Sequence, residues 1–152
     1  MNLVLWAAFL FSVVMYHALV VGNILPAQPS AQGELLSYIF LFLGIFQLLV
    51  IVNLDIFLIA RPRRIKIGGD VLQGQRPQDD PVALAAQMKA AYYRRLFILM
   101  CALAETIGIY GLLVYLLGGG KMFAHALMGI AYLSLIYIWL RARASWEAMY
   151  LE

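Results

Sequence analysis

The stretch ALAETIGIYGLLVYLLGGG, residues 102–120, decides the fold class. It is an apolar run that ends in three glycines, and glycine is the residue that most often ends a helix. Its composition is that of a membrane-spanning helix, yet Glu105 stands within it. An ionisable side chain inside a membrane is costly and usually marks a functional position. The role of Glu105 is therefore the first question that the sequence raises.

The whole chain shares the apolar character of this stretch. Of its 152 residues, 64% are hydrophobic and only 12% are charged, and the mean hydropathy is +0.86. Soluble domains are about half apolar and about a quarter charged. The composition therefore predicts an integral membrane protein, and neither a soluble enzyme nor a nucleic-acid-binding protein.

Four apolar segments each approach the roughly 20 residues that a bilayer crossing needs. They cover about residues 3–25, 35–60, 96–117 and 122–140. We expect an all-α protein with a single transmembrane domain over residues 1–152, an integral membrane four-helix bundle of two antiparallel transmembrane hairpins. The first segment lacks a basic stretch before it and is too long for the apolar part of a signal peptide, so we expect it to be retained.

The polar region between the second and third segments predicts the orientation. Residues 61–95 carry eight Lys and Arg against three Asp, whereas the opposite side has only Lys121. Cytoplasmic loops of membrane proteins are enriched in Lys and Arg. We therefore expect this loop and both termini in the cytoplasm, below a bacterial-type inner membrane. The basic residues expected to contact lipid headgroups or a partner protein are Arg61, Arg63, Arg64, Lys66, Arg94 and Arg95.

The loop also contains the start of the third helix. Asp80 suits the position that caps a helix and Pro81 suits the first helical position. Residues 82–97 contain no helix breaker and run into the third apolar segment, so the sequence predicts one helix from about Pro81 to Leu117, extended into the cytoplasm. After Leu140, either a short interfacial helix or a flexible tail is expected.

Polar residues at membrane depth are candidate site residues, because such side chains usually face other helices rather than lipid. Their depths follow from counting inward from the cytoplasmic ends at about 1.5 Å per residue. The layer predicted around Glu105 contains Ser12, Asn53, Tyr132 and Ser134. A second layer, nearer the outside, contains His17, Gln47 and Tyr110.

Two roles are open for Glu105. In one, a protonated carboxyl group is hydrogen-bonded to Asn53, Tyr132 or a backbone carbonyl and holds the helices in register. In the other, Glu105 takes up and releases a proton or a sodium ion. A carboxylate in mid-membrane suits that task because its surroundings set its charge.

The sequence predicts no cofactor and no metal site. Cys101 is the only cysteine, and we expect it to be a buried packing residue. His17 and His125 both lie toward the outer half, and two histidines on neighbouring helices can ligate a heme iron. Their counted depths differ by several residues, so a heme or quinone anchor is only a distant alternative.

The segment RRLFILMCALAETIGIYGLLVYLL, residues 94–117, resembles the ion-carrying helix of the rotary ATPase c subunit, the proteolipid. Ala104-Glu105 and the run from Ile109 to Val114, which begins Ile-Tyr-Gly-Leu, match that family's motifs at matching spacing. The resemblance implies that Glu105 is the ion carrier and that Tyr110 is a hydrogen-bond partner close to it.

Over its whole length, the chain looks like small four-helix bacterial membrane proteins that have a third helix of the AExxxIYGLL type. Gly44 is the only glycine in residues 35–60. The proteolipid's inner helix instead has a glycine repeat that lets neighbouring copies pack into a tight ring. We therefore expect a non-enzymatic subunit of a larger or oligomeric membrane assembly, whose partners are lipids and other subunits or further copies. The alternative is a proton- or ion-translocating proteolipid that uses Glu105.

Overall fold

The computed structural model describes residues 3–22, 24, 31–54 and 81–150, and the regular secondary structure of this part is α-helical. Four helices follow one another: α1 (Leu3–Val21), α2 (Ala31–Leu54), α3 (Pro81–Leu116) and α4 (Lys121–Tyr150). Each contains a segment long and apolar enough to cross a membrane. The predicted all-α class with four apolar helices is confirmed.

Three helix boundaries differ from the predicted segments. α1 ends at Val21 rather than near residue 25, because a hydrogen bond of 2.8 Å from the Gly22 N–H to the Ala18 carbonyl closes its last turn. α2 already begins at Ala31. α4 continues without a break to Tyr150. The residues after Leu140 are therefore helical rather than a flexible tail, but they extend α4 and do not form a separate short helix. The predicted start of α3 at Pro81 is confirmed.

A tight turn at the end of α3 joins it to α4. Gly118 has a φ of 75°, a conformation that costs glycine little. The Gly119 N–H donates to the Val114 carbonyl at 2.8 Å, and the Gly118 N–H donates to the Tyr115 carbonyl at 3.2 Å. This pair of bonds is a Schellman motif, which satisfies the last carbonyls of a helix. The turn makes α3 and α4 antiparallel neighbours, and we call this end of the molecule the turn end.

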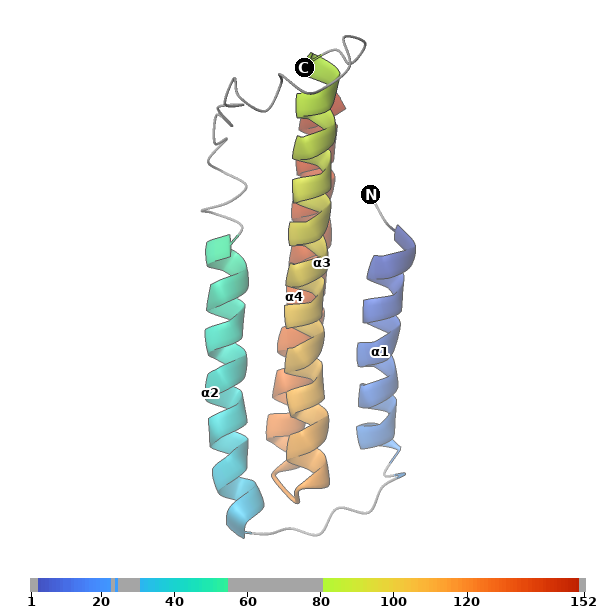
Figure 1. Ribbon diagram of the computed structural model, residues 1–152. Helices are drawn as coiled ribbons and strands as arrows, with labels where there is room; N and C mark the ends of the chain where they lie inside the picture. Colours follow the sequence, from blue (N-terminus) through green and yellow to red (C-terminus); the bar gives the residue numbers. More distant parts are fainter. Residues whose placement is uncertain (1–2, 23, 25–30, 55–80, 151–152) are drawn as a thin grey trace.

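α1 and α2 lie on opposite sides of the α3–α4 pair (Figure 1). Both pack against α3 and α4, but they scarcely touch each other. The structure thus differs from the expected two packed hairpins, since only α3 and α4 form one. The reason lies in the connections. The α3–α4 turn has too few residues for α3 and α4 to lie apart. The connection between Val21 and Ala31 is longer, so α1 and α2 can lie on opposite sides of the α3–α4 pair.

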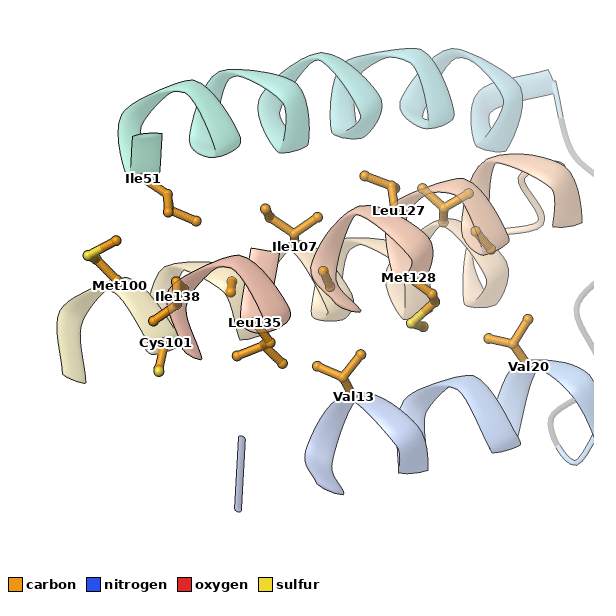
Figure 2. Packing of buried hydrophobic residues seen from close by; sticks show 14 of the residues in the cluster. Val13, Val20, Ile51, Met100, Cys101, Ile107, Leu127, Met128, Leu135 and Ile138 are labelled. Carbon is orange, nitrogen blue, oxygen red and sulfur yellow. The ribbon is translucent and has the colours of Figure 1, made fainter. Parts of the chain in front are cut away.

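The core runs along the contact between α3 and α4 (Figure 2). Small residues let the two backbones approach: a Cβ atom on Gly111 would lie 2.9 Å from the Ala124 carbonyl oxygen. Val13 and Val20 of α1 reach this core from one side and Ile51 of α2 from the other (Figure 2). The fully buried larger side chains of α3 and α4 include Ile107, Val114, Leu127, Met128, Leu135 and Ile138.

The two flanking helices expose most of their surface. Only 11% of the apolar segment of α1 and 17% of that of α2 are buried, against 44% and 39% in α3 and α4. Their exposed side chains are nevertheless large and apolar, with Phe11 and Phe42 as examples. Such surfaces are unfavourable in water and suit the hydrocarbon of a bilayer.

Candidate functional site

Glu105 lies where α1 meets α3. Its Oε1 accepts a hydrogen bond of 3.2 Å from the Tyr16 hydroxyl, and the carboxyl group is partly buried. Ser12, one turn before Tyr16, lies close enough to interact with the Tyr16 hydroxyl, although its own hydroxyl donates to the Ala8 carbonyl at 3.2 Å. A carboxyl group beside a phenolic hydroxyl can bind a proton or a hard cation through oxygen atoms.

Tyr16 was missed by depth counting, and the reason is geometric. Side chains of an α-helix lean toward the start of their helix. The Tyr16 ring, which is long, therefore reaches back along α1 and brings its hydroxyl to Glu105. Counting backbone positions alone favoured Ser12. The signal available in the sequence was the Tyr16-His17 pair itself, two adjacent polar side chains one turn after Ser12 in a largely apolar segment.

A second polar group links α1 to α4 near the turn end. His17 Nε2 lies 3.2 Å from His125 Nδ1, and the two ring centroids are 5.3 Å apart. The Tyr132 hydroxyl lies 3.4 Å from His17 Nδ1 and donates a long hydrogen bond, also of 3.4 Å, to the Val13 carbonyl. The expectation of different depths for the two histidines is therefore wrong. His17 is four residues before the end of α1, and His125 is four residues after the start of α4.

The remaining members of the predicted layer around Glu105 do not reach it. Asn53 is exposed on α2, where its side-chain amide donates to the Leu49 carbonyl at 2.7 Å. Ser134 is buried and donates to the Ile130 carbonyl of its own helix at 2.8 Å. Tyr132 belongs to the histidine group. Because α2 lies on the far side of α3 and α4, Asn53 cannot share a layer with the α1–α3 contact.

Tyr110 and Gln47 belong to the α2 side of the molecule. The Tyr110 ring stacks on Phe40 of α2, with centroids 5.3 Å apart, and so points away from Tyr16 and Glu105. Five residues along an α-helix amount to a rotation of about 140°, which separates Tyr110 from Glu105. Gln47 Oε1 is buried and lacks a hydrogen-bond partner among the described residues.

Trp6 and Trp139 connect the other end of α1 to α4. Trp6 donates a hydrogen bond of 3.1 Å from its indole nitrogen to the Leu135 carbonyl. Its ring lies 4.7 Å from that of Trp139. An indole that is apolar over most of its surface and has one donor is well suited to such a helix contact.

Two of the six predicted headgroup-contact residues fall in the described part of the chain. Arg94 and Arg95 are exposed on α3, and Arg141 and Arg143 are exposed on α4. The other four, Arg61, Arg63, Arg64 and Lys66, lie outside the described residues. The exposed arginines of α3 and α4 are at similar distances from the Gly118 turn, so antiparallel packing brings them to the same level.

Cys101 is fully buried, as expected of a packing residue. In the described part of the chain, no three His, Cys, Asp or Glu side chains gather in an arrangement that could hold a metal ion. The polar groups of the site are thus the Glu105–Tyr16 pair and, separately, the group of His17, His125 and Tyr132. No family model, no curated protein and no solved structure matches this chain.

Proposed function

We propose that the chain is a small, non-enzymatic subunit of a larger or oligomeric assembly in a bacterial-type inner membrane, which it crosses four times. The length and apolarity of the four helices support the crossings, as do the large apolar side chains exposed on α1 and α2. These features favour lipid as the surroundings of the flanking helices.

The proposed orientation puts the turn end outside and residues 61–95 with both termini in the cytoplasm. Arg95 is about 33 Å from Leu117 at 1.5 Å per residue, close to the roughly 30 Å of a hydrocarbon core. Arg141 and Arg143 are at nearly the same distance from Lys121. An arginine-rich level one bilayer thickness from the turn supports a cytoplasmic position for that level.

The observation that carries the assembly proposal is the partly buried carboxyl group of Glu105 in the middle of its span. Glu105 lies about 16 Å from the end of α3, near half the thickness of a hydrocarbon core. A carboxyl group at that depth is unfavourable next to lipid and favours contact with protein. We infer that a neighbouring subunit covers the α1–α3 edge and that the Glu105–Tyr16 pair lies at this contact.

Site-specific photo-crosslinking in native membranes tests the assembly. A photoreactive residue at Met15, exposed on α1 next to Tyr16, is expected to capture a protein partner. The matched control is Phe42, which is exposed on α2. Mass spectrometry of the products distinguishes a second copy of this chain from another subunit. If Met15 yields only lipid adducts, as we expect for Phe42, the assembly proposal fails.

The Glu105–Tyr16 pair also supports a second candidate function, proton or ion translocation. A carboxyl group with the Tyr16 hydroxyl beside it offers oxygen ligands of the kind that a proton carrier or a sodium site uses. Carbodiimide should then label Glu105, and sodium or a change of pH should protect it, whereas Glu105→Gln should abolish labelling. Labelling that neither sodium nor pH affects would count against ion exchange and leave the structural role.

A further inference from the structure

We propose that His17 and His125 form a binding site for a zinc-class divalent cation, which ties the turn end of α1 to α4. The site joins two helices that are far apart in the sequence and is separate from the Glu105–Tyr16 pair. It does not depend on the proposed role of Glu105. Imidazole nitrogens select zinc, copper or nickel, and not magnesium or calcium, which prefer oxygen ligands.

The separation of the two nitrogens fits a shared metal ion. Zinc binds histidine nitrogen at about 2.0–2.1 Å in tetrahedral geometry, which places two ligand nitrogens about 3.3 Å apart. His17 Nε2 and His125 Nδ1 are 3.2 Å apart. A cation can therefore replace the hydrogen bond between the rings with only small rotations of the side chains.

The hydrogen bonds of Tyr132 determine which nitrogen of His17 is available. Tyr132 has a single hydroxyl proton, which it can donate to the Val13 carbonyl. We assign the hydroxyl proton to that carbonyl, so that the Tyr132 oxygen accepts the proton on His17 Nδ1. His17 Nε2 is left with its lone pair directed at His125. A hydrogen bond to the second ring nitrogen is the usual way in which proteins orient a metal-binding histidine.

His125 supplies the second ligand by moving one proton. Without a metal ion, its Nδ1–H donates to His17 Nε2. With a metal ion, His125 changes tautomer, so that Nδ1 offers a lone pair and Nε2 holds the proton. The ring stays neutral, and no net proton is released. Because His125 is exposed, its Nε2–H is not buried and does not need a hydrogen-bond acceptor inside the protein.

The position of the pair suits an ion that arrives from water. Both histidines are one helical turn from the end of their helix at the turn end. His125 is exposed, and its position one turn from the end of its helix is where we expect water to supply the remaining ligands. Lys121 begins α4 one turn before His125, and its charge disfavours a cation. We therefore expect weaker affinity than that of a structural zinc site with four protein ligands.

Calorimetric titration of the full chain in detergent with zinc, after treatment with a chelator, tests the site. We expect one zinc ion per chain and a rise in the thermal unfolding temperature, neither of which magnesium should produce. His125→Ala, at an exposed position, should reduce affinity at least tenfold without loss of folding. Tyr132→Phe keeps both ligands but removes the acceptor for His17 Nδ1–H, and should weaken binding by roughly tenfold.

Two control variants test whether zinc binds at the histidine pair and not elsewhere. Cys101→Ser and Glu105→Gln should both bind zinc as the unmodified chain does, because neither side chain belongs to the site. His17→Gln, which preserves a polar side chain of similar size, should behave as His125→Ala does. The proposal is overturned if the unmodified chain takes up no zinc, or if uptake survives in both histidine variants.

Discussion

The two sides of the α3–α4 pair are built differently. On the α1 side, side chains make directed hydrogen bonds between helices, from Trp6 to Leu135 and from Tyr16 to Glu105. On the α2 side, the contacts are aromatic rings and close approach, such as Phe40 on Tyr110 and Gly44 on Leu127. α1 therefore has directed polar contacts in addition to its apolar packing, whereas close packing is prominent on the α2 side. In a membrane, where burial of apolar surface does not distinguish helix contact from lipid contact, both are recognised ways to join helices.

The largest expected effect comes from disrupting the α2 side at Gly33. A Cβ atom there would collide with the backbone at Leu117 and Gly118, which cannot move without opening the turn. Gly33→Val should therefore destabilise the chain by about 3 kcal/mol in thermal unfolding in detergent. Gly129→Ala is the matched control, because its Cβ meets nothing within 4 Å, and it should be neutral or stabilising by about 0.5–1 kcal/mol. Equal stability of the two variants would contradict docking of α2 by shape.

A smaller loss is expected from Phe40→Ala, also on the α2 side. The variant removes a partly buried ring and its stacking on Tyr110, which should cost about 2 kcal/mol in the same unfolding measurement. Tyr110→Phe keeps the stack and should change stability by less than about 0.5 kcal/mol. If Tyr110→Phe were the more harmful variant, the Tyr110 hydroxyl would matter as the proteolipid resemblance implies.

On the α1 side, Tyr16→Phe removes the hydroxyl that donates to Glu105 and keeps the ring. We expect a loss of about 1 kcal/mol, typical of one hydrogen bond between side chains. A double-mutant cycle with Glu105→Leu should give a coupling energy of similar size, since the two residues share that bond. Zero coupling would mean that the pair contributes nothing to the position of α1.

The smallest effect is predicted for Asn53. Its amide bonds only to its own helix among the described residues and its side chain is exposed, so Asn53→Leu should change stability by less than about 0.5 kcal/mol. It should also leave carbodiimide labelling of Glu105 unchanged. A change in that labelling would indicate that Asn53 and Glu105 lie in one layer, as depth counting predicts.

Length and apolarity were sufficient to predict the helices, because a 20-residue apolar run has few alternatives. The start of α3 at Pro81 and its end before Gly118 followed from capping residues. The packing of the helices against one another could not be predicted from these signals. α1 and α2 have large apolar residues all around the helix and few polar ones, so no apolar stripe in their sequences indicates which face is inward.

The candidate site was predicted in part for the same reason. Glu105, His17 and Tyr132 do lie between helices, but their partners depended on where α1 ends. The four-residue shift of that end toward Val21 brought His17 level with His125. The placement of Asn53 beside Glu105 assumed that α2 lies next to α1, a contact that the straddling arrangement lacks.

The straddling of α3 and α4 by α1 and α2 has a consequence for biosynthesis. A ribosome completes the N-terminal segments first, and α1 and α2 offer each other almost no contact surface. In a membrane, both helices would remain as separate lipid-solvated segments until α3, against which both of them pack, has been inserted. Because both sequences are strongly apolar, each helix is stable in lipid before it packs against another helix. Truncation after α2 should therefore leave two independent spans rather than a half-assembled protein.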